Sequence, residues 1–327
     1  MSLISVIATA YRRRQYLYNA LLSLKAQTLS KDKYEVVVVK DFEDPQIDGL
    51  IKEMGWKSAY SDVEHQGPKY LIGLLEASGD VIALLDDDDI FKPTKLEYVY
   101  NVFSQNPDVG YLQHTFEVIN ANGVPMPCLA REAPRNIVNV NELKVPWDEV
   151  RKHRSYGVLD PVVYILTRYR IFADKNGGAL TVKRELFERH KDALAKLSLA
   201  IDSFLLASAI AERTSLYFSN EALSLWRYHG SNISTWYVLP DGDERKMSVL
   251  YRYYISYGLI SRTFFDFYPN YYACLSEEHK LIYLDLAKRL GKPTAGLTPD
   301  RSVMLWCCIA GLCLNEFQRY FMAPIRL

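Results

Sequence analysis

The segment ALLDDDDIFKP, residues 83–93, places four consecutive carboxylates directly after an apolar run. The apolar part extends back to Val81 and is typical of a strand that is buried on both faces, as in a parallel sheet. Pro93 is suited to the first turn of a following helix. In open parallel α/β sheets, ligands bind beyond the carboxyl ends of the strands. The four aspartates are therefore expected at the ligand-binding edge of such a sheet.

The residues before this segment predict the other strands of that sheet. LISVIATA (3–10) and YEVVVVKDF (34–42) are short apolar runs of the same kind. The residues between them predict a helix, with Leu17, Leu21 and Leu24 on one face. Strand, helix and strand in this order form a βαβ unit. YLIGLLEASGD (70–80) predicts a helix that ends near Gly79, so the acidic strand is the third one.

The residues after the segment predict further strands and helices. A helix is expected from Pro93 to Asn106, and residues 124–175 are expected to hold long loops and short elements. Strand-like or mixed patterns occupy VGYLQHTFEVI (109–119), GGALTVKRELFERH (177–190) and SLYFSNEALSLWRYHGSNIS (215–234), and LSLAIDSFLLASAIAE (197–212) predicts a mostly apolar helix.

Composition narrows the class of protein. Lys plus Arg and Asp plus Glu both number 39, and this balance argues against nucleic acid as the main partner. The five cysteines form no C-x-x-C pair and no zinc pattern, which favours reduced thiols in a cytoplasmic protein. The first apolar run precedes its basic residues, unlike a signal peptide. No apolar stretch reaches the length of a transmembrane helix.

Several interpretations of the acidic run compete. Alternation along a strand would place Asp86 and Asp88 on one side, where they could hold Mg²⁺ or Mn²⁺. A solvated loop with helix-capping aspartates is the simplest alternative. An ATPase would need G-x-x-x-x-G-K-[ST], which the sequence lacks. A phosphatase would use Asp86 as nucleophile, but its motif usually opens the domain, and DGDE (241–244) does not follow an apolar strand.

The order and spacing of these motifs resemble a family 2 glycosyltransferase of the GT-A fold. The opening ISVIATAYRRRQYLYNALLSLKAQT (4–28) is similar to the family's I-S-V-I-x-P-T-Y-N-R followed by L…S-L…Q-T. VVVVKDFED (36–44) stands where the family has a D-D-G-S-like turn, and LLDDDDIFKP (84–93) is similar to L-D-x-D-D followed by Pro. Fainter matches, which extend the resemblance over residues 3–235, are GALTVKRELFE (178–188), AIDSFLL (200–206) and SLWRYHGSNIS (224–234).

The chain also departs from the family pattern. Thr9-Ala10 replaces Pro-Thr and Arg12 replaces the usual Asn. Lys40 replaces the first Asp of D-D-G-S, so Asp41 alone remains to contact the nucleotide base. The remaining departures are Lys69 or Tyr70 in place of the Arg of A-R-N-x-G, and Ile201 in place of the Glu before Asp202. These changes bear on the nucleotide base and the sugar more than on the fold.

The resemblance implies a Rossmann-like α/β domain with a mostly parallel sheet flanked by helices. It also implies Mn²⁺- or Mg²⁺-dependent transfer of a sugar, with inversion, from a nucleotide-diphosphate donor to an acceptor hydroxyl. Asp202 is the expected catalytic base. The expected metal ligands are Asp88, Asp89 and His229. The expected donor-binding residues are Thr9, Ala10, Tyr11, Asp41, Lys69, Asp86, Asp87 and Arg227.

Simpler roles for these residues stay open. Asp202 could cap a helix, His229 could be an ordinary hydrogen-bonded residue, and Arg227 could form a surface ion pair. The four adjacent aspartates could also exchange their roles. The acceptor stays open among a glycan, a lipid-linked molecule and a protein.

The expected organisation is a nucleotide-sugar-binding half over residues 1–115, an acceptor-binding half over 116–238 and a helical region over 239–327. The helical region is expected to hold one helix around Met247–Ile255, a second from Ser276 and a third over 301–320. These helices could pack on the catalytic domain or on a second subunit in a homodimer. Aromatic and cationic side chains would alternatively suit peripheral contact with the inner face of a membrane.

Two other functions remain as alternatives. A nucleotidyltransferase on a similar fold would need a Gly-rich loop after the first strand, and TAYRRRQ (9–15) contains no Gly. A non-catalytic nucleotide-sugar-binding or membrane-associated scaffold is compatible with the Lys40 and Ile201 departures.

Overall fold

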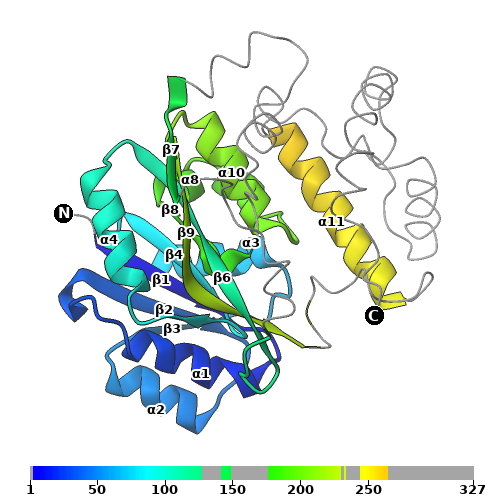
Figure 1. Ribbon diagram of the computed structural model, residues 1–327. Helices are drawn as coiled ribbons and strands as arrows, with labels where there is room; N and C mark the ends of the chain where they lie inside the picture. Colours follow the sequence, from blue (N-terminus) through cyan, green and yellow to red (C-terminus); the bar gives the residue numbers. More distant parts are fainter. Residues whose placement is uncertain (1–2, 127–140, 149–175, 230–231, 233–243, 264–327) are drawn as a thin grey trace. The chain divides into compact units, whose positions relative to one another are not determined.

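The computed structural model describes residues 3–126, 141–148, 176–229, 232 and 244–263 (Figure 1). The chain separates into two compact units, Met1–Asn232 and Ile233–Leu327. The described elements of the first unit form one α/β sheet with its helices. The described part of the second unit is helix α11 (Glu244–Thr263), which confirms the helix expected around Met247.

The N-terminal part of the sheet is parallel, as predicted. Its strands run in the order β3-β2-β1-β4, with β1 (Ile4–Thr9) in register with both of its neighbours. Thr9 therefore lies beside Val39 and Asp86, so the carboxyl ends of three strands are level. The bounds of the other strands and their connecting helices are β2 (Tyr34–Lys40), β3 (Lys57–Tyr60), β4 (Val81–Asp86), α1 (Arg14–Lys25), η1 (Lys31–Lys33), α2 (Pro45–Glu53) and α3 (Gln66–Glu76).

The second part of the sheet is mixed. Strand β8 (Leu180–Lys183) lies antiparallel between β4 and β6 (Val109–Asn120). Strand β9 (Ser215–Tyr228) pairs in parallel with β6 and antiparallel with β5 (Ile90–Phe91) and β7 (Glu142–Val145). The remaining helices are α4 (Lys95–Gln105), η3 (Gly177–Ala179), α8 (Glu185–Glu188), α9 (Lys191–Leu194) and α10 (Ile201–Ala211). The α/β class is confirmed, with parallel pairing concentrated in the N-terminal half.

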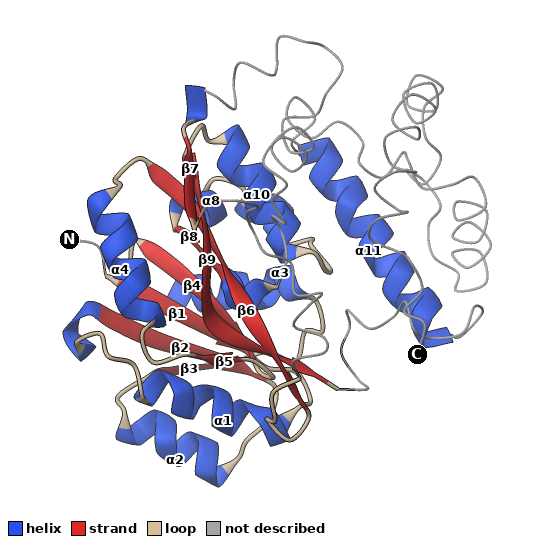
Figure 2. Cartoon of the chain, in the orientation of Figure 1, coloured by secondary structure: helices blue, strands red, loops and turns tan. Residues whose placement is uncertain are grey.

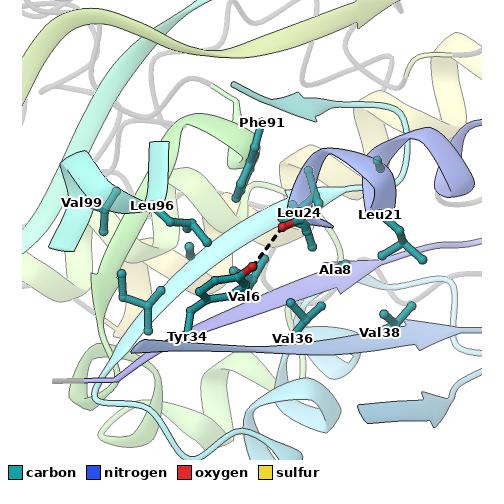
Figure 3. Packing of buried hydrophobic residues seen from close by; sticks show 14 of the residues in the cluster. Val6, Ala8, Leu21, Leu24, Tyr34, Val36, Val38, Phe91, Leu96 and Val99 are labelled. Carbon is teal, nitrogen blue, oxygen red and sulfur yellow. Dashed lines mark hydrogen bonds between the residues drawn. The ribbon is translucent and has the colours of Figure 1, made fainter. Parts of the chain in front are cut away.

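Successive side chains of β1 and β2 are buried on opposite faces of the sheet. Val6 and Val36 lie on the face covered by α1 and α4, where Leu21, Leu24, Leu96 and Val99 pack against them (Figure 3). The Tyr34 hydroxyl, at the same face, donates a hydrogen bond to the Leu24 carbonyl at 3.1 Å. Figure 2 shows α1 and α2 side by side next to these strands.

Helix α3 covers the opposite face of the same strands. A methyl group on Gly73 would lie 2.4 Å from Ile7 Cγ2 and 3.2 Å from Val39 Cγ2. The helix can therefore lie this close to the sheet only because position 73 has no side chain. Burial on both faces explains the continuous apolar runs of β1, β2 and β4.

Helix α3 begins at Gln66, four positions before the expected start, because Pro68 suits a first helical turn. The helices expected from Ser276 and over 301–320 lie outside the described residues, as do 127–140 and 149–175 of the region expected to be loops. Within the described ranges, no helix has both the length and the apolar character needed to cross a bilayer.

Candidate active site at the carboxyl edge of the sheet

The four aspartates form a tight turn at the end of β4. The strand ends at Asp86, and the Asp89 amide donates to the Asp86 carbonyl at 3.2 Å. Strand alternation therefore stops at Asp86 and does not extend to Asp88, so it cannot be the reason for these two carboxylates to lie on one side. The residues Asp87, Asp88 and Asp89 are each 7% exposed or less, so the simple alternative of a solvated loop is also excluded.

Arg13 holds two of these carboxylates together. Its Nη2 lies 2.6 Å from Asp87 Oδ1, and its Nη1 lies 2.6 Å from Asp88 Oδ2. Arg13 precedes α1, so the ion pairs join the end of β1 to the end of β4. One guanidinium thus offsets the repulsion between two adjacent buried carboxylates. Arg13 is not among the site residues expected from the sequence, because its pairing with Asp87 and Asp88 spans more than 70 positions.

Asp88 also binds residues of the second half of the sheet. His229 Nε2 lies 3.0 Å from Asp88 Oδ2, and the Asn232 side chain donates to the same oxygen at 3.4 Å. Asn232 Oδ1 accepts a bond from the His229 amide, so the loop after β9 orients both groups. Burial would raise the pKa of Asp88, but the His229 and Arg13 contacts outweigh it and lower the pKa. Asp88 is therefore a buried carboxylate that stays ionised.

The ring of His229 also packs against an aromatic side chain of α1. The Tyr16 and His229 ring centroids lie 4.9 Å apart, and the Arg227 guanidinium lies 5.0 Å from the Tyr16 centroid. Tyr16 restricts the imidazole and thereby favours the orientation that directs Nε2 at Asp88.

Arg227 and Asp89 brace the acidic turn from the other side. Asp89 Oδ1 accepts from the Arg227 amide at 3.2 Å, and Arg227 Nε donates to the Asp88 carbonyl at 2.9 Å. Arg227 Nη1 donates to the Asn120 and Ala121 carbonyls at 3.3 and 3.0 Å. The guanidinium expected to contact a diphosphate is thus buried and already bonded to three carbonyls. Burial and the charges of Asp88 and Asp86 raise the pKa of Asp89 well above its ordinary value.

Asp86 lies between a tyrosine and a glycine. The Tyr70 hydroxyl donates to Asp86 Oδ1 at 3.2 Å, and a methyl group on Gly177 would lie 3.2 Å from Asp86 Oδ2. Burial, and next the charge of Asp88, raise the pKa of Asp86 to about 6. Burial likewise raises the pKa of Asp87, to about 8, so the protonation states of both aspartates change near neutral pH.

The other expected donor-binding residues gather where β1 ends. The Ala10 amide donates to the Val39 carbonyl at 2.8 Å, and the Tyr11 amide donates to Asp87 Oδ2 at 3.4 Å. The Arg12 amide donates to Asp41 Oδ1 at 2.9 Å, with Arg12 at a φ of 58°. This left-handed conformation favours Asn, the residue that the family pattern has at this position.

Lys69 reaches the same place from α3. Its Nζ donates to the Ala10 carbonyl at 3.2 Å and lies 4.1 Å from the Tyr11 ring centroid. Burial lowers the pKa of Lys69 to about 8, and the charges of Asp41 and Asp87 oppose that shift. Lys40, in contrast, points toward α2, where its Nζ lies 2.8 Å from Asp48 Oδ1.

Asp202 lies in the first turn of α10. The N-cap position is Ala200, with a φ of 64°, so Asp202 does not cap the helix and that alternative is excluded. The Ser203 amide donates to Asp202 Oδ1 at 3.0 Å. The charge of Asp202 contributes to the raised pKa of Asp86, which places Asp202 within electrostatic reach of the acidic turn.

Comparison with known proteins defines the family. Residues 5–153 match the model of the family described as Glycosyl transferase family 2. This part of the chain belongs to glycosyltransferase family 2. An uncharacterised glycosyltransferase of Nostoc sp. (strain PCC 7120) is 30% identical over 138 residues, and one of Haemophilus influenzae is 28% identical over 117 residues. These matches cover 40% and 34% of this chain and 42% and 38% of the two relatives, so the chain spans less than half the length of each.

Solved glycosyltransferase structures share the fold over a longer stretch. Residues 1–349 of the S. aureus protein TarS, in complex with UDP, align with a TM-score of 0.53 at 16% identity, and the alignment covers 90% of this chain and 73% of that one. The mannosyltransferase PcManGT of Pyrobaculum calidifontis, in complex with GDP-Man and Mn²⁺, aligns with a TM-score of 0.52 at 14% identity, covering 98% and 83%. The likeness confirms the predicted GT-A fold.

Proposed function

We propose that this chain is a family 2 glycosyltransferase that takes its sugar from a nucleotide-diphosphate donor. The observation that carries the proposal is the arrangement around Asp88, whose carboxylate meets Arg13 from one half of the sheet and His229 from the other. This convergence lies at the carboxyl edge, where α/β sheets bind ligands. The nucleotide sugars bound by TarS and PcManGT support the same donor class.

A divalent metal ion fits two of the expected ligands. Within the described ranges, no group of three or more His, Cys, Asp or Glu side chains is arranged to hold a metal. Adjacent ligand atoms on an octahedral ion, each at about 2.1 Å, lie about 3.0 Å apart. Asp88 Oδ2 and His229 Nε2 have this 3.0 Å separation. Mg²⁺ usually keeps several waters and is held by one or two carboxylates together with substrate phosphates, so a two-residue site is sufficient.

The metal-binding residues in this proposal are Asp88 and His229, with Mn²⁺ or Mg²⁺ as the ion. When bound there, such an ion would supply positive charge to a leaving diphosphate. Asp89 is directed at the Arg227 amide and at Gly178, so we assign it to the support of the turn. Arg13 lies between Asp87 and Asp88 and provides a second positive charge next to the same edge.

The end of β1 would hold the nucleotide. Tyr11 offers a ring, Asp41 a carboxylate and Lys69 an ammonium, and these groups can stack on a base or form hydrogen bonds with it. Asp86, with Tyr70 on one oxygen, would accept a bond from a ribose hydroxyl. Thr9 and Ala10 would contribute through their backbone, since Thr9 ends β1 and Ala10 follows it at this edge.

Asp202 is proposed as the general base. Inversion requires a base on the face of the sugar opposite the leaving group, where it removes the proton of the acceptor hydroxyl. Asp202 lies in the first turn of α10 in the second half of the domain, whereas Tyr11, Asp41 and Lys69 lie in the first half. The attacking oxygen would then form its bond to the anomeric carbon as the diphosphate leaves.

The test is the release of nucleoside diphosphate from a panel of nucleotide sugars that includes UDP-GlcNAc and GDP-Man. We expect at least one donor to be turned over with Mn²⁺ or Mg²⁺ and the rate to fall to background with a chelator. Turnover that continues unchanged with chelator would refute the metal assignment. Failure of every donor to bind, measured by calorimetry with metal present, would refute the proposed function.

A further inference from the structure

Lys95 is a fully buried lysine that the proposed mechanism does not use. Its side chain has 0% relative exposure, although lysine is almost never fully buried without a partner. Its ammonium lies 3.3 Å from the Phe91 ring centroid and donates a hydrogen bond to the Gly178 carbonyl. Burial lowers its pKa well below the ordinary value, against the charges of Asp89 and Asp86. Charged or neutral, the amine still has an N–H to donate.

The carbonyl that Lys95 binds belongs to a short turn of the second half of the domain, Asn176–Gly178. The Gly178 amide donates to Asn176 Oδ1 at 2.9 Å, and the Ala179 amide donates to the Asn176 carbonyl at 2.9 Å. Asn176 has a φ of 63°, a left-handed conformation that Asn tolerates better than most residues. The turn is thus closed on itself and is attached to the first half through Lys95.

This turn lies directly against the acidic turn. A methyl group on Gly178 would lie 2.6 Å from Asp89 Oδ2, and one on Gly177 would lie 3.2 Å from Asp86 Oδ2. Two glycines therefore allow the backbone of one half to approach two carboxylates of the other. A shift of the turn would change the room available to both carboxylates.

We propose that Lys95 is a positioning residue, which holds the Asn176–Gly178 turn against Asp86 and Asp89 through the Gly178 carbonyl. Lys95 is the first residue of α4, and it lies five positions after Ile90, the first residue of β5. The helix that follows the acidic turn in the chain therefore also anchors the Asn176–Gly178 turn. The effect on turnover rests on the proposed function, whereas the effect on the turn does not.

The experiment compares hydrogen exchange and turnover in Lys95→Met, Lys95→Gln and Lys92→Met. Lys92 is the matched control, because its ammonium forms an exposed ion pair with Glu117 at 2.6 Å and does not contact the turn. We expect the Gly178 and Ala179 amides of the ligand-free Lys95→Met protein to exchange at least about tenfold faster, since their bonds close the released turn. The amide nitrogen of Lys95→Gln lies one bond nearer the backbone than the lysine amine, so this variant should also lose the bond to the Gly178 carbonyl, and it replaces the Met variant should that one not fold.

The second measurement is the rate of donor turnover. We expect kcat to fall about tenfold or more in the Lys95 variants, with a smaller change in the donor KM, because a misplaced turn affects orientation more than donor contacts. Unchanged exchange of both amides in a folded Lys95 variant would overturn the inference. If the wild-type protein turns over no donor while exchange still accelerates, the proposed function fails and the positioning role stands.

Discussion

The Nε2 atom of His229 lies 3.0 Å from Oδ2 of Asp88, although 141 positions separate the two residues in the chain. Both side chains are less than 10% exposed. The pairing joins the end of β4 to the end of β9, which belong to different halves of the sheet. This pair identifies the place where we expect donor and metal to meet, and the following predictions start from it.

Replacing Asp88 by Asn should reduce donor turnover by about 100-fold or more, because the amide cannot supply the charge that a divalent ion needs. The measurement is kcat/KM for nucleoside diphosphate release at several Mn²⁺ concentrations. Asp62→Asn, at an exposed position, is the control and should behave as wild type. Full activity of a folded Asp88→Asn protein would remove Asp88 from the metal site.

Asn232→Ala should weaken the apparent affinity for Mn²⁺ by about 10- to 100-fold, the usual effect of losing a residue that orients a metal ligand. Asn232 accepts a bond from the His229 amide and donates one to the Arg227 carbonyl at 2.8 Å. Its loss should therefore be partly rescued by higher Mn²⁺. Asn101→Ala, on the exposed side of α4, serves as the control. A Mn²⁺ titration that is identical to wild type would contradict the prediction.

Asp202→Asn should lower kcat by about 10²- to 10⁴-fold, the range that a general base contributes, while donor binding is retained. Calorimetry with a nucleoside diphosphate and kinetics with the matching donor separate the two quantities. Asp192→Asn, exposed in α9, is a control with the same chemical change. Equal losses of donor affinity and of kcat would instead place Asp202 in the donor site.

Donor binding should weaken as pH rises through about 8, because the Lys69 ammonium loses its charge there. Below that pH the lysine is protonated and can donate to a base carbonyl or a phosphate. The measurement is a calorimetric titration with a nucleoside diphosphate and Mg²⁺ between pH 7 and 9.5. Donor affinity should decline with pH for wild type and for Lys52→Met, a control at an exposed lysine. For Lys69→Met the affinity should be lower and independent of pH. A parallel decline in Lys69→Met would assign the pH dependence to another group.

Glu35 should stabilise the fold at neutral pH but not in acid. Burial acts to raise its pKa, but bonds from Ser5, Lys57 and Ser78 outweigh burial and lower the pKa from 4.5 to about 2. Since the folded-state pKa is the lower one, the contribution is complete above pH 4.5 and is lost as pH falls toward 2.

Urea unfolding of Glu35→Gln checks this. At pH 7 the variant should lose about 1 kcal/mol of unfolding free energy, a modest figure because the carboxylate is only partly buried. The difference from wild type should shrink toward pH 3. Glu53→Gln, which removes the exposed ion pair with Lys25, should cost less at both pH values. If the loss of unfolding free energy in Glu35→Gln were the same at every pH, the charge of Glu35 would not be the cause of its stabilising effect.

The sequence by itself determined the parallel half of the fold. The runs of β1, β2 and β4 are apolar on both faces, which is typical of a parallel sheet that is covered by helices on both sides. The amphipathic spacing of Leu17, Leu21 and Leu24 determined α1 in the same way. Because these signals are local, they also located Asp86–Asp89 at the carboxyl edge.

Only the tertiary structure decided which groups meet at that edge. Arg13 binds Asp88 across 75 positions and His229 binds it across 141, and neither pairing leaves a periodic signal in the sequence. The turn that ends β4 at Asp86 also means that strand alternation does not set the directions of the aspartates that follow. Contacts of this kind depend on sheet register and on loop closure between distant segments, and these are set by packing of the whole domain.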